Sequence, residues 1–444
     1  MSPDFVRRMS TPVPRYTSYP TAAQFRDTVG AQDFAAALTK LADDTPFSLY
    51  VHVPYCKKLC WYCGCNMKVA RTKEPVTRYL NALEAELLAL AELGLSKHKI
   101  SYMHWGGGSP NILTAEQILA LAASIRDSFE IDAAAEFAVE IDPRESSASL
   151  AQALRGAGVN RVSIGVQDFD PAVQTAINRQ QSFEVTSACI DSLRDAGIDK
   201  VNVDLVYGLP LQTRSGIEAT VEQVISLRPN RVALFGYAHL PARFAHQSII
   251  DSKTLPDSVE RFAQSQRAAR ILNAAGYVQV GLDHYALKDD PLALGPVRRN
   301  FQGYTTDTSE TLVGVGASSI SSLGSAYFQN VSSPAEYEKR IAATGLATTR
   351  GVKLTDEDRV RRYVIAKLMC DFSFSESDIR ERFGALASRV ILEGREMVEA
   401  DSAGLLEKAE NGFVVTPRGQ PFVRSIAACF DTYFDSATRG SPAV

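Results

Sequence analysis

Short apolar runs rich in β-branched and aromatic residues recur between residues 46 and 240. Runs of this length and composition are typical of strands buried in a parallel sheet. Stretches with apolar residues at helical spacing separate them, and the alternation predicts βαβ units. The clearest predicted helices are 76–93, 115–129, 150–157 and 183–196. The predicted strands are 48–53, 100–105, 136–141, 160–166, 201–207 and 231–237, with a further strand over 277–283.

Six βα repeats are too few to close an eight-stranded TIM barrel, so the pattern predicts an open, partial (β/α)6 barrel over residues 46–350. After residue 350 the alternation of predicted strands and helices gives way to mostly helical patterns. Helices are predicted over 354–370, 378–383 and 386–400, followed by a hairpin over 405–415 with Asn411-Gly412 at its turn. This order resembles a winged-helix domain, so residues 351–444 are expected to form a mostly helical accessory domain.

Residues 1–45 carry few periodic apolar positions. Within them, the proline-bounded segment Pro14-Arg-Tyr-Thr-Ser-Tyr-Pro20 is predicted to be extended, because a proline disfavours helical backbone in the residue before it. Two interpretations stay open for this N-terminal arm. It is either a surface tail, as termini often are, or a segment that folds over a functional site.

Functional groups of parallel α/β barrels gather at the carboxyl ends of the strands. Each of the six predicted strands ends in a cysteine, a glycine or a polar residue. These features are therefore expected to converge at one end of the barrel. In chain order they are the run Cys56–Cys65, the run Gly106-Gly107-Gly108-Ser109, Glu140, Gln167, Asp204 and Tyr237-Ala238.

Several of these residues have both a functional and a structural interpretation. Three consecutive glycines allow a ligand to approach the main chain closely. Glu140 and Asp204 lie in apolar strands, where an unpaired carboxylate is costly to bury, so they need a ligand or an internal salt bridge. His52 and His104 are most simply satisfied core histidines.

Four of the seven cysteines lie within ten residues, and Cys56, Cys60 and Cys63 have the spacing C-x3-C-x2-C. Three thiolates on a short loop can ligate three irons of a 4Fe–4S cluster, which leaves the fourth iron open for chemistry. A structural zinc site usually needs a second ligand pair a dozen or more residues away, and none follows. A disulfide framework needs an oxidising compartment. The N-terminus shows no apolar signal core, so the sequence does not indicate such a compartment. The spacing therefore favours the cluster.

Cys65 follows Cys63 by only two residues, which makes it a poor fourth ligand for the same cluster. A fourth thiolate would also close the open iron. We therefore expect Cys65 to lie near the reaction site as a thiol, with a purely structural role as the alternative.

Composition excludes some classes of function. The chain has 444 residues, a formal net charge of −4 and 22% charged residues, so no basic face indicates binding to nucleic acid. No apolar run approaches the roughly 18 residues that a membrane span requires. The expected location is the cytosol.

The motifs together resemble the radical S-adenosylmethionine (SAM) superfamily and, within it, the oxygen-independent coproporphyrinogen III oxidase family. The resemblance covers nearly the whole chain, with slight departures at Ser109, where the family often has threonine, and at Trp61-Tyr62. Besides the three cysteines and the N-terminal arm, it rests on Cys63-Gly-Cys-Asn66, His104-Trp-Gly-Gly-Gly-Ser-Pro110, Asp142-Pro-Arg-Glu145, Gly165-Val-Gln-Asp-Phe169, Asp204-Leu-Val-Tyr-Gly-Leu-Pro210, Tyr237-Ala-His-Leu-Pro241, Arg299-Asn-Phe-Gln-Gly-Tyr-Thr-Thr306 and Cys429-Phe-Asp-Thr-Tyr433.

The resemblance implies an oxidoreductase of haem and porphyrin biosynthesis. Such an enzyme uses one 4Fe–4S cluster on Cys56, Cys60 and Cys63 and a 5′-deoxyadenosyl radical to convert two propionates of coproporphyrinogen III to vinyl groups. It also implies two SAM molecules per chain. The first would contact Tyr50, Gly107, Glu140 and Ile320. The second would contact Tyr62, Gly108, Ser109, Gln167, Arg179, Asp204 and Ala238.

Further expectations follow from the same resemblance. Cys65 and Tyr62 are expected to act in catalysis. A reducing donor such as flavodoxin or ferredoxin is expected to supply electrons, and the chain is expected to be a monomer. The tetra-anionic substrate needs cationic partners, for which Arg15, Arg243, Arg298 and Arg299 are candidates because they lie near motifs. The alternatives are a haem chaperone of the same superfamily and a related enzyme that modifies haem. Such chaperones generally lack the fourth cysteine and the N-terminal arm, both present here.

Overall fold

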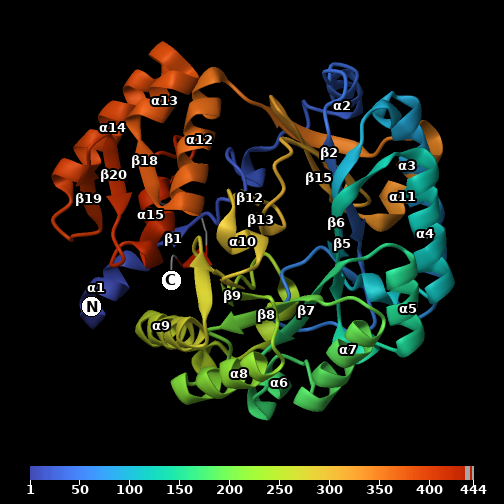
Figure 1. Cartoon of the computed structure of the whole chain (residues 1–444), viewed down its shortest axis with the longest axis horizontal. Coiled ribbons are helices and arrows are strands. Elements are labelled where there is room, and N and C mark those ends of the chain that lie inside the picture. Colours follow the sequence, from blue (N-terminus) through green and yellow to red (C-terminus); the bar gives the residue numbers. More distant parts are fainter. Residues whose placement is uncertain (436–440, 443–444) are drawn as a thin grey trace.

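A twelve-stranded sheet organises the chain in the computed structural model, which describes residues 1–435 and 441–442. Seven neighbouring strands are parallel and curve into an open barrel (Figure 1). In sheet order they are β14 (Thr311–Val315), β2 (Phe47–Val53), β5 (Ile100–Gly107), β6 (Ile131–Ile141), β7 (Arg161–Gln167), β8 (Lys200–Tyr207) and β9 (Arg231–Gly236).

Antiparallel strands extend both edges of this parallel region. On the β9 side they are β11 (His284–Leu287) and β10 (Tyr277–Val280), and on the β14 side β15 (Ile320–Leu323), β16 (Ala326–Asn330) and β17 (Thr348–Lys353). The predicted partial (β/α)6 barrel is confirmed, because all six predicted strands form and pair in parallel. The predicted strand over 277–283 is shorter, ends at Val280 and runs antiparallel.

Helices cover the outer side of the parallel strands (Figure 1). Most begin at a hydroxyl residue whose side chain accepts a hydrogen bond from a first-turn amide, as Thr114, Ser147, Ser182 and Thr213 do. Their apolar faces complete one large core with the sheet. The helices are α3 (Glu74–Glu92), α4 (Ala115–Ser128), α5 (Ala148–Gly156), α6 (Pro171–Ala176), α7 (Phe183–Asp195), α8 (Arg214–Ser226), α9 (Ser258–Ala274) and α11 (Pro334–Thr344).

The C-terminal region contains the predicted helices and hairpin. Its elements are α12 (Asp356–Asp371), β18 (Ser373–Ser375), α13 (Glu376–Phe383), α14 (Ser388–Ala400), β19 (Leu406–Ala409), β20 (Gly412–Val415) and α15 (Val423–Ala428). The predicted hairpin turn is shifted by one residue. Ala409 pairs with Gly412, so Glu410 and Asn411 form the turn. Gly412 instead lies in β20 with φ of 131°, where a Cβ would lie 2.0 Å from the carbonyl oxygen of Phe374.

The N-terminal arm is not a surface tail, because Tyr16 and Tyr19 are only 4% and 1% exposed. Each phenol bonds to the end of the C-terminal region: Tyr16 donates to Asp431 Oδ2 (2.9 Å), and the Tyr19 oxygen lies 3.0 Å from that of Thr432. Two helices were not predicted there, α1 (Pro3–Met9) and α2 (Ala31–Leu38). In Figure 1, α1 lies beside the C-terminal region, far along the chain but close in space.

Three short elements connect the barrel to the C-terminal region: α10 (Pro291–Leu294), β12 (Arg298–Asn300) and β13 (Gly303–Thr305) (Figure 1). Strand β1 (Pro12–Val13) of the arm pairs with β21 (Ser441–Pro442). Among the helices that the structure describes, none combines the length and apolarity that crossing a membrane requires.

Candidate active site

The cysteine loop begins directly after β2, at the carboxyl end of the parallel strands. Cys56 ends the short strand β3 (Tyr55–Cys56), which pairs with β4 (Lys68–Val69) on the far side of the loop. Three hydrogen bonds fix the loop from elsewhere in the chain: Trp61 N to Ile177 O (2.9 Å), Asn178 Nδ2 to Leu59 O (2.8 Å) and Gln247 Nε2 to Tyr62 O (2.9 Å). The thiols are therefore presented on a loop held at both α6 and the segment after β9.

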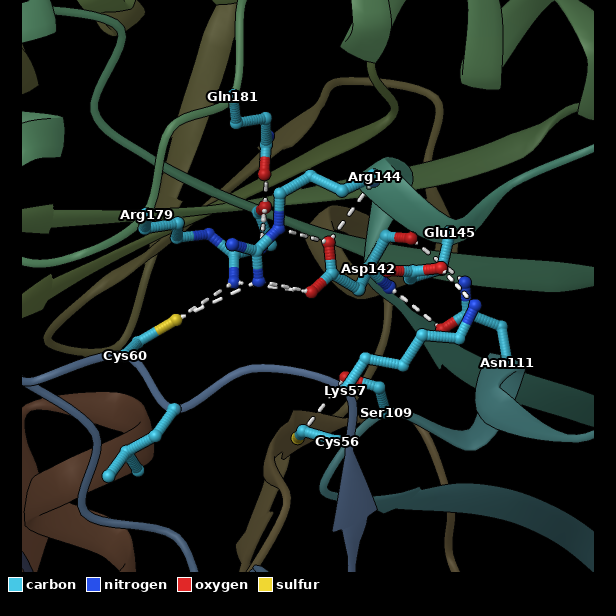
Figure 2. Close-up of polar contacts among 12 residues, drawn as sticks. Cys56, Lys57, Cys60, Ser109, Asn111, Asp142, Arg144, Glu145, Arg179 and Gln181 are labelled. Atoms are coloured by element: carbon cyan, nitrogen blue, oxygen red, sulfur yellow. Dashed lines mark hydrogen bonds and ion pairs between the residues drawn. The ribbon is translucent and has the colours of Figure 1, made fainter. Parts of the chain in front are cut away.

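Two arginines point at the sulfur of Cys60 (Figure 2). Arg179 Nη1 lies 3.5 Å and Arg144 Nη2 3.8 Å from Cys60 Sγ. Asp142 holds both guanidinium groups, at 2.6 Å from Arg144 and 3.5 Å from Arg179. Burial would raise the pKa of Asp142, but the arginines outweigh it and lower that pKa. The sulfur of Cys60, a predicted iron ligand, thus has two guanidinium donors beside it.

The other thiols have separate partners. Cys56 Sγ lies 3.4 Å from Ser109 Oγ, and burial raises the pKa of the Cys56 thiol to about 12. The backbone amide of Cys65 donates to Cys63 Sγ at 3.4 Å. A hydrogen bond from the Cys65 side chain is the main reason that the pKa of Cys63 falls to about 7. Cys65 is thus close to the predicted ligands, bonded to Cys63 rather than turned away.

A 4Fe–4S cluster fits this donor set. Within the described residues, no three His, Cys, Asp or Glu side chains are grouped so that they could hold a metal ion. The three thiols lie on one loop, with guanidinium donors beside Cys60 and a hydroxyl beside Cys56. A buried thiol such as Cys56 would lose its proton on binding iron. The positive charge of the iron would then compensate the negative charge of the buried thiolate.

The triple glycine is required by contacts within the chain. A Cβ on Gly106 would lie 2.7 Å from Glu140 Oε1, and one on Gly108 would lie 2.6 Å from the Tyr55 carbonyl oxygen. Gly107 has φ of 112°, and its Cβ would meet the ring of His52 at 2.4 Å. Glycine here lets β5 end directly against β2, β3 and Glu140, which brings the cysteine loop close to the barrel mouth.

Glu140 is held in the barrel mouth by groups of β5. His104 Nε2 lies 3.2 Å from Glu140 Oε1, and the amide of Gly107 donates to Oε2 at 3.1 Å. Burial would raise the pKa of Glu140, yet these partners outweigh it and the pKa is lowered. The carboxylate stays 38% exposed to the open interior, so it can accept further hydrogen bonds while charged. The prediction that His104 and His52 are satisfied histidines is confirmed, since both are buried and bonded.

Asp204 has the opposite character. Burial and the neighbouring charge of Glu140 raise its pKa to about 7. The hydroxyl of Ser163 lies 3.2 Å from both of its carboxylate oxygens and donates a hydrogen bond to them. Among the described residues, Asp204 does not form the salt bridge considered as its alternative, whereas Glu140 pairs with His104.

The residues predicted to bind the first SAM lie on adjoining strands. Tyr50 on β2 stacks on His104 with ring centres 5.9 Å apart and pairs in register with Gly314 of β14. A Cβ on Gly314 would lie 2.8 Å from the carbonyl oxygen of Ile320, so glycine allows β15 to bring Ile320 over this strand. The structure thus places these residues on β6, β5, β2 and β15, which are interior strands of the sheet, with β14 between the last two.

The residues predicted to bind the second SAM lie around β7. Arg179 donates to the carbonyl of Gly165 at 2.7 Å, and Gly165 pairs in register with Asp204. Gln167 ends β7 with φ of 70° and turns its amide back over Gly165, where a Cβ would meet it at 2.8 Å. Tyr62 and Tyr237, which precedes Ala238, belong to one small apolar cluster beside the loop.

Asp142 and Arg144 were not predicted as site residues, although Asp142-Pro-Arg-Glu145 is one of the motifs of the resemblance. The motif forms a helical turn over Pro143–Glu145, which Asp142 caps. The sequence does contain a signal for them: Asp142 lies at a strand end, two residues after Glu140, and the basic Arg144 follows closely. Arg243 is exposed and lies over the ring of Phe244, which borders Gly64 of the cysteine loop, so its predicted contact with the substrate stays a prediction. Arg298 pairs with Glu310.

Comparison with known proteins supports this geometry. The family model of the radical SAM superfamily matches residues 50–224, and that of the HemN C-terminal domain matches residues 354–422. The oxygen-independent coproporphyrinogen III oxidase of Bradyrhizobium diazoefficiens is 43% identical over 427 residues, which cover 95% of each chain. That of Escherichia coli is 39% identical over 431 residues, covering 96% of this chain and 94% of the relative.

A solved structure has the same fold. The coproporphyrinogen III oxidase HemN of Escherichia coli, described as a radical SAM enzyme, superposes with a TM-score of 0.90 at 40% identity and covers 95% of this chain and 98% of that one. Barrel, cysteine loop and superfamily match together define a radical SAM enzyme, a class that implies a 4Fe–4S cluster and SAM. Sequence identity of about 40% along nearly the whole length identifies the family more specifically than the superfamily match does. The chain belongs to the oxygen-independent coproporphyrinogen III oxidase family.

Proposed function

We propose that the protein catalyses the oxygen-independent oxidative decarboxylation of two propionates of coproporphyrinogen III, which yields the two vinyl groups of protoporphyrinogen IX. The observation that carries the proposal is the match to an oxidase of this name over 95% of the chain. The radical SAM cofactors suit the reaction, because an unactivated C–H bond of a propionate needs a radical to break it.

The chain's own residues would position the cofactors. Cys56, Cys60 and Cys63 would hold the cluster, with Arg144 and Arg179 donating to Cys60. When bound, the cluster supplies the electron that cleaves SAM to methionine and a 5′-deoxyadenosyl radical, which removes a hydrogen atom from the substrate. The charged Glu140 would accept hydrogen bonds from a first SAM in the barrel mouth.

We also propose that a second SAM binds beside the first. Arg179, Gln167 and Asp204 meet around Gly165, on the side of the barrel away from Ile320. Two cofactor sites would use the two sets of residues expected from the family, Tyr50, Gly107, Glu140 and Ile320 for the first, and Tyr62, Gly108, Ser109, Gln167, Arg179, Asp204 and Ala238 for the second. Equilibrium dialysis with labelled SAM should find two bound per reconstituted chain, and saturation at one would contradict this.

The remaining expectations stand as part of the same proposal. A reducing protein such as flavodoxin or ferredoxin would supply electrons, the chain would act as a monomer, and the setting would be the cytosol. Cys65 and Tyr62 would act at the site next to the cluster ligands.

The test is an anaerobic incubation of the reconstituted enzyme with SAM, a reductant and coproporphyrinogen III, followed by mass analysis. We expect loss of two CO2 per product molecule and consumption of two SAM. A haem chaperone would instead bind haem tightly and leave the propionates intact, and a haem-modifying enzyme would change haem. Either of those outcomes would overturn the proposal.

A further inference from the structure

The loop that carries the cysteines is strongly basic, although the chain as a whole is acidic. Residues 55–74 contain five Lys or Arg and one Glu, a net charge of +4 in a chain whose net charge is −4. All five cations are exposed. An excess of one sign on a single exposed segment attracts partners of the opposite charge. We call these five residues the basic surface: Lys57, Lys58, Lys68, Arg71 and Lys73.

Backbone pairing brings the two halves of the basic surface together at the first cluster ligand. Cys56 of β3 pairs in register with Val69 of β4, and the amide of Ala70 donates to the carbonyl of Cys56 at 3.0 Å. Lys57 directly follows Cys56, so it lies beside the segment that continues from Ala70 to Arg71. Val69 is 40% exposed and places an apolar side chain among the charges. Apolar contact area with a charged rim is typical of a protein interface.

Little of this charge is neutralised within the chain. Lys57 forms an ion pair with Glu145 (Figure 2). The other four cations form no ion pair with any residue that the structure describes. Exposed lysines are commonly solvated rather than paired, so their freedom alone does not mark a binding site. What distinguishes these cations is their place, on the loop that carries the predicted iron ligands.

An open cavity of about 810 Å³ leads from the basic surface toward the predicted ligand Cys60. Lys57 and Lys58 line it, as does Arg144, whose Nη2 lies 3.8 Å from Cys60 Sγ. Three cations and three carboxylates line the cavity, so the excess positive charge belongs to the loop beside it. Val185, 41% exposed, adds an apolar wall. A protein docked here would lie one side chain away from Cys60.

The later half of the cysteine loop is covered by the chain itself. His246 Nε2 lies 2.7 Å from the carbonyl oxygen of Cys63. A Cβ on Gly64 would lie 3.4 Å from the ring of Phe244, which is ordinary contact distance. The segment after β9 thus packs on this half. The half that begins at Lys57 is therefore the one that a partner protein can reach.

We propose that the basic surface, together with the adjoining cavity, is the docking site of an acidic electron-carrier protein. The inference rests on the proposed function, which requires electrons at the cysteine loop. One electron would pass from the reduced carrier to the oxidised cluster, so the carrier is oxidised and no bond or proton is exchanged. Complementary charge speeds the encounter of two proteins and orients them. A carrier docked on this side would leave the barrel mouth free for the substrate.

The test is binding of oxidised flavodoxin, an acidic carrier, to the reconstituted enzyme, measured by titration calorimetry without SAM or substrate. Binding to the unmodified protein should weaken as salt is added. Lys58→Glu combined with Arg71→Glu should weaken it about tenfold at low salt, because two attractive charges become repulsive. Lys97→Glu combined with Lys200→Glu is the matched control. It changes the net charge equally, at exposed positions near the amino ends of β5 and β8, and should bind as the unmodified protein does.

The rate of cluster reduction separates docking from damage to the site. In stopped-flow mixing, reduced flavodoxin should reduce the cluster of the Lys58→Glu, Arg71→Glu variant about tenfold more slowly than that of the unmodified protein. Reduced methyl viologen, a small cation that needs no docking surface, should reduce both clusters at similar rates. The visible absorbance of the cluster shows that the variant is intact.

The salt dependence is measured on the unmodified protein, so it does not depend on how a variant folds. Absent or salt-independent binding of flavodoxin would overturn the inference, as would equal losses in the double variant and its control. If the double variant instead lost affinity for coproporphyrin III, the basic surface would serve the substrate, which would also overturn it. Normal docking and cluster reduction without release of CO2 would contradict only the proposed function.

Discussion

At the scale of single residues, the cysteine loop has more support than its spacing indicates. The C-x3-C-x2-C pattern predicts three ligands, and Glu140, Gln167 and Asp204 were predicted from their places at strand ends. The pair of arginines beside Cys60, held together by Asp142, was not predictable. Asp142 and Arg144 meet Arg179 only through the packing of three βα units (Figure 2). Local sequence gives no sign of a contact between residues so far apart in the chain.

Replacing Arg144 should change the cluster's electronic properties. Arg144→Gln removes a cation 3.8 Å from Cys60 Sγ, which destabilises the more negative, reduced state. The midpoint potential should fall by tens of millivolts, since about 60 mV corresponds to roughly 1.4 kcal/mol for one electron. Redox titration followed by electron paramagnetic resonance measures it. Lys57→Gln, which breaks only a pair with Glu145, is the control, and an equal shift in both would contradict a specific role.

Cys65→Ser should separate the fourth cysteine from the three ligands. The cluster's visible absorbance should persist, because Cys65 bonds to Cys63 rather than replacing it, while vinyl formation should fall strongly. Cys60→Ser provides the comparison, with the absorbance lost. If Cys65→Ser also lost the cluster, Cys65 would be a ligand.

Asp204 should make the protein without SAM less stable at alkaline pH. Its pKa in the folded protein is raised to about 7, above that of an unfolded aspartate, so stability is full at low pH and is lost as the pH rises through about 7. Asp204→Asn should therefore gain about 1–3 kcal/mol at pH 8, and the gain should shrink toward pH 5. Chemical unfolding across this range tests it, with the exposed Asp199→Asn as control. A gain that does not depend on pH would rule this explanation out.

At the scale of elements, a buried carboxylate joins three parts of the fold. Glu86 of α3 is 1% exposed and accepts hydrogen bonds from the amide of Gly316 after β14, from Asn330 of β16 and from Tyr337 of α11, each at 2.7 Å. Glu86 thus ties the first helix of the barrel to the strands that extend its far edge.

Removing this carboxylate should destabilise the whole barrel. Glu86→Ala removes the carboxylate acceptor of three buried donors, of which Asn330 and Tyr337 each keep one further acceptor. Because each lost bond to a buried donor costs about 1–3 kcal/mol, the free energy of unfolding should fall by about 3 kcal/mol. Glu92→Ala, at the exposed end of the same helix, should change it by less than about 0.5 kcal/mol. Denaturant unfolding measures both. Similar losses in the two variants would show that the network contributes little.

The elements differ in how far the sequence predicts them. The six strands and the main helices follow from local apolar patterns. Strands β14 to β17 were missed because they are short, and because β14, which joins them to the barrel, pairs with β2, a strand distant in sequence. The hairpin turn was shifted by one residue because Gly412 serves close packing against Phe374 rather than the turn.

At the scale of the whole molecule, the two ends of the chain form one unit. Phe5, Val13, Tyr16 and Tyr19 share a core with α12, α14 and α15. A cavity of about 420 Å³, whose lining includes Arg15, Arg261, Arg299 and Arg424, lies where this unit meets the ends of β8 and β9. Arg15 and Arg299 were candidates from their motifs, whereas Arg261 and Arg424 lie on helices whose sequence indicates no cavity. Their role depends on how the ends of the chain pack against the barrel.

The central claim is that the radical formed at the cysteine loop attacks a substrate propionate. Its most direct test uses coproporphyrinogen III deuterated at the β-carbons of its propionates, in an anaerobic single turnover with the reconstituted enzyme. Mass analysis should find deuterium in 5′-deoxyadenosine. For each deuterium atom transferred, one propionate should have become a vinyl group. Undeuterated 5′-deoxyadenosine together with intact propionates would contradict the account.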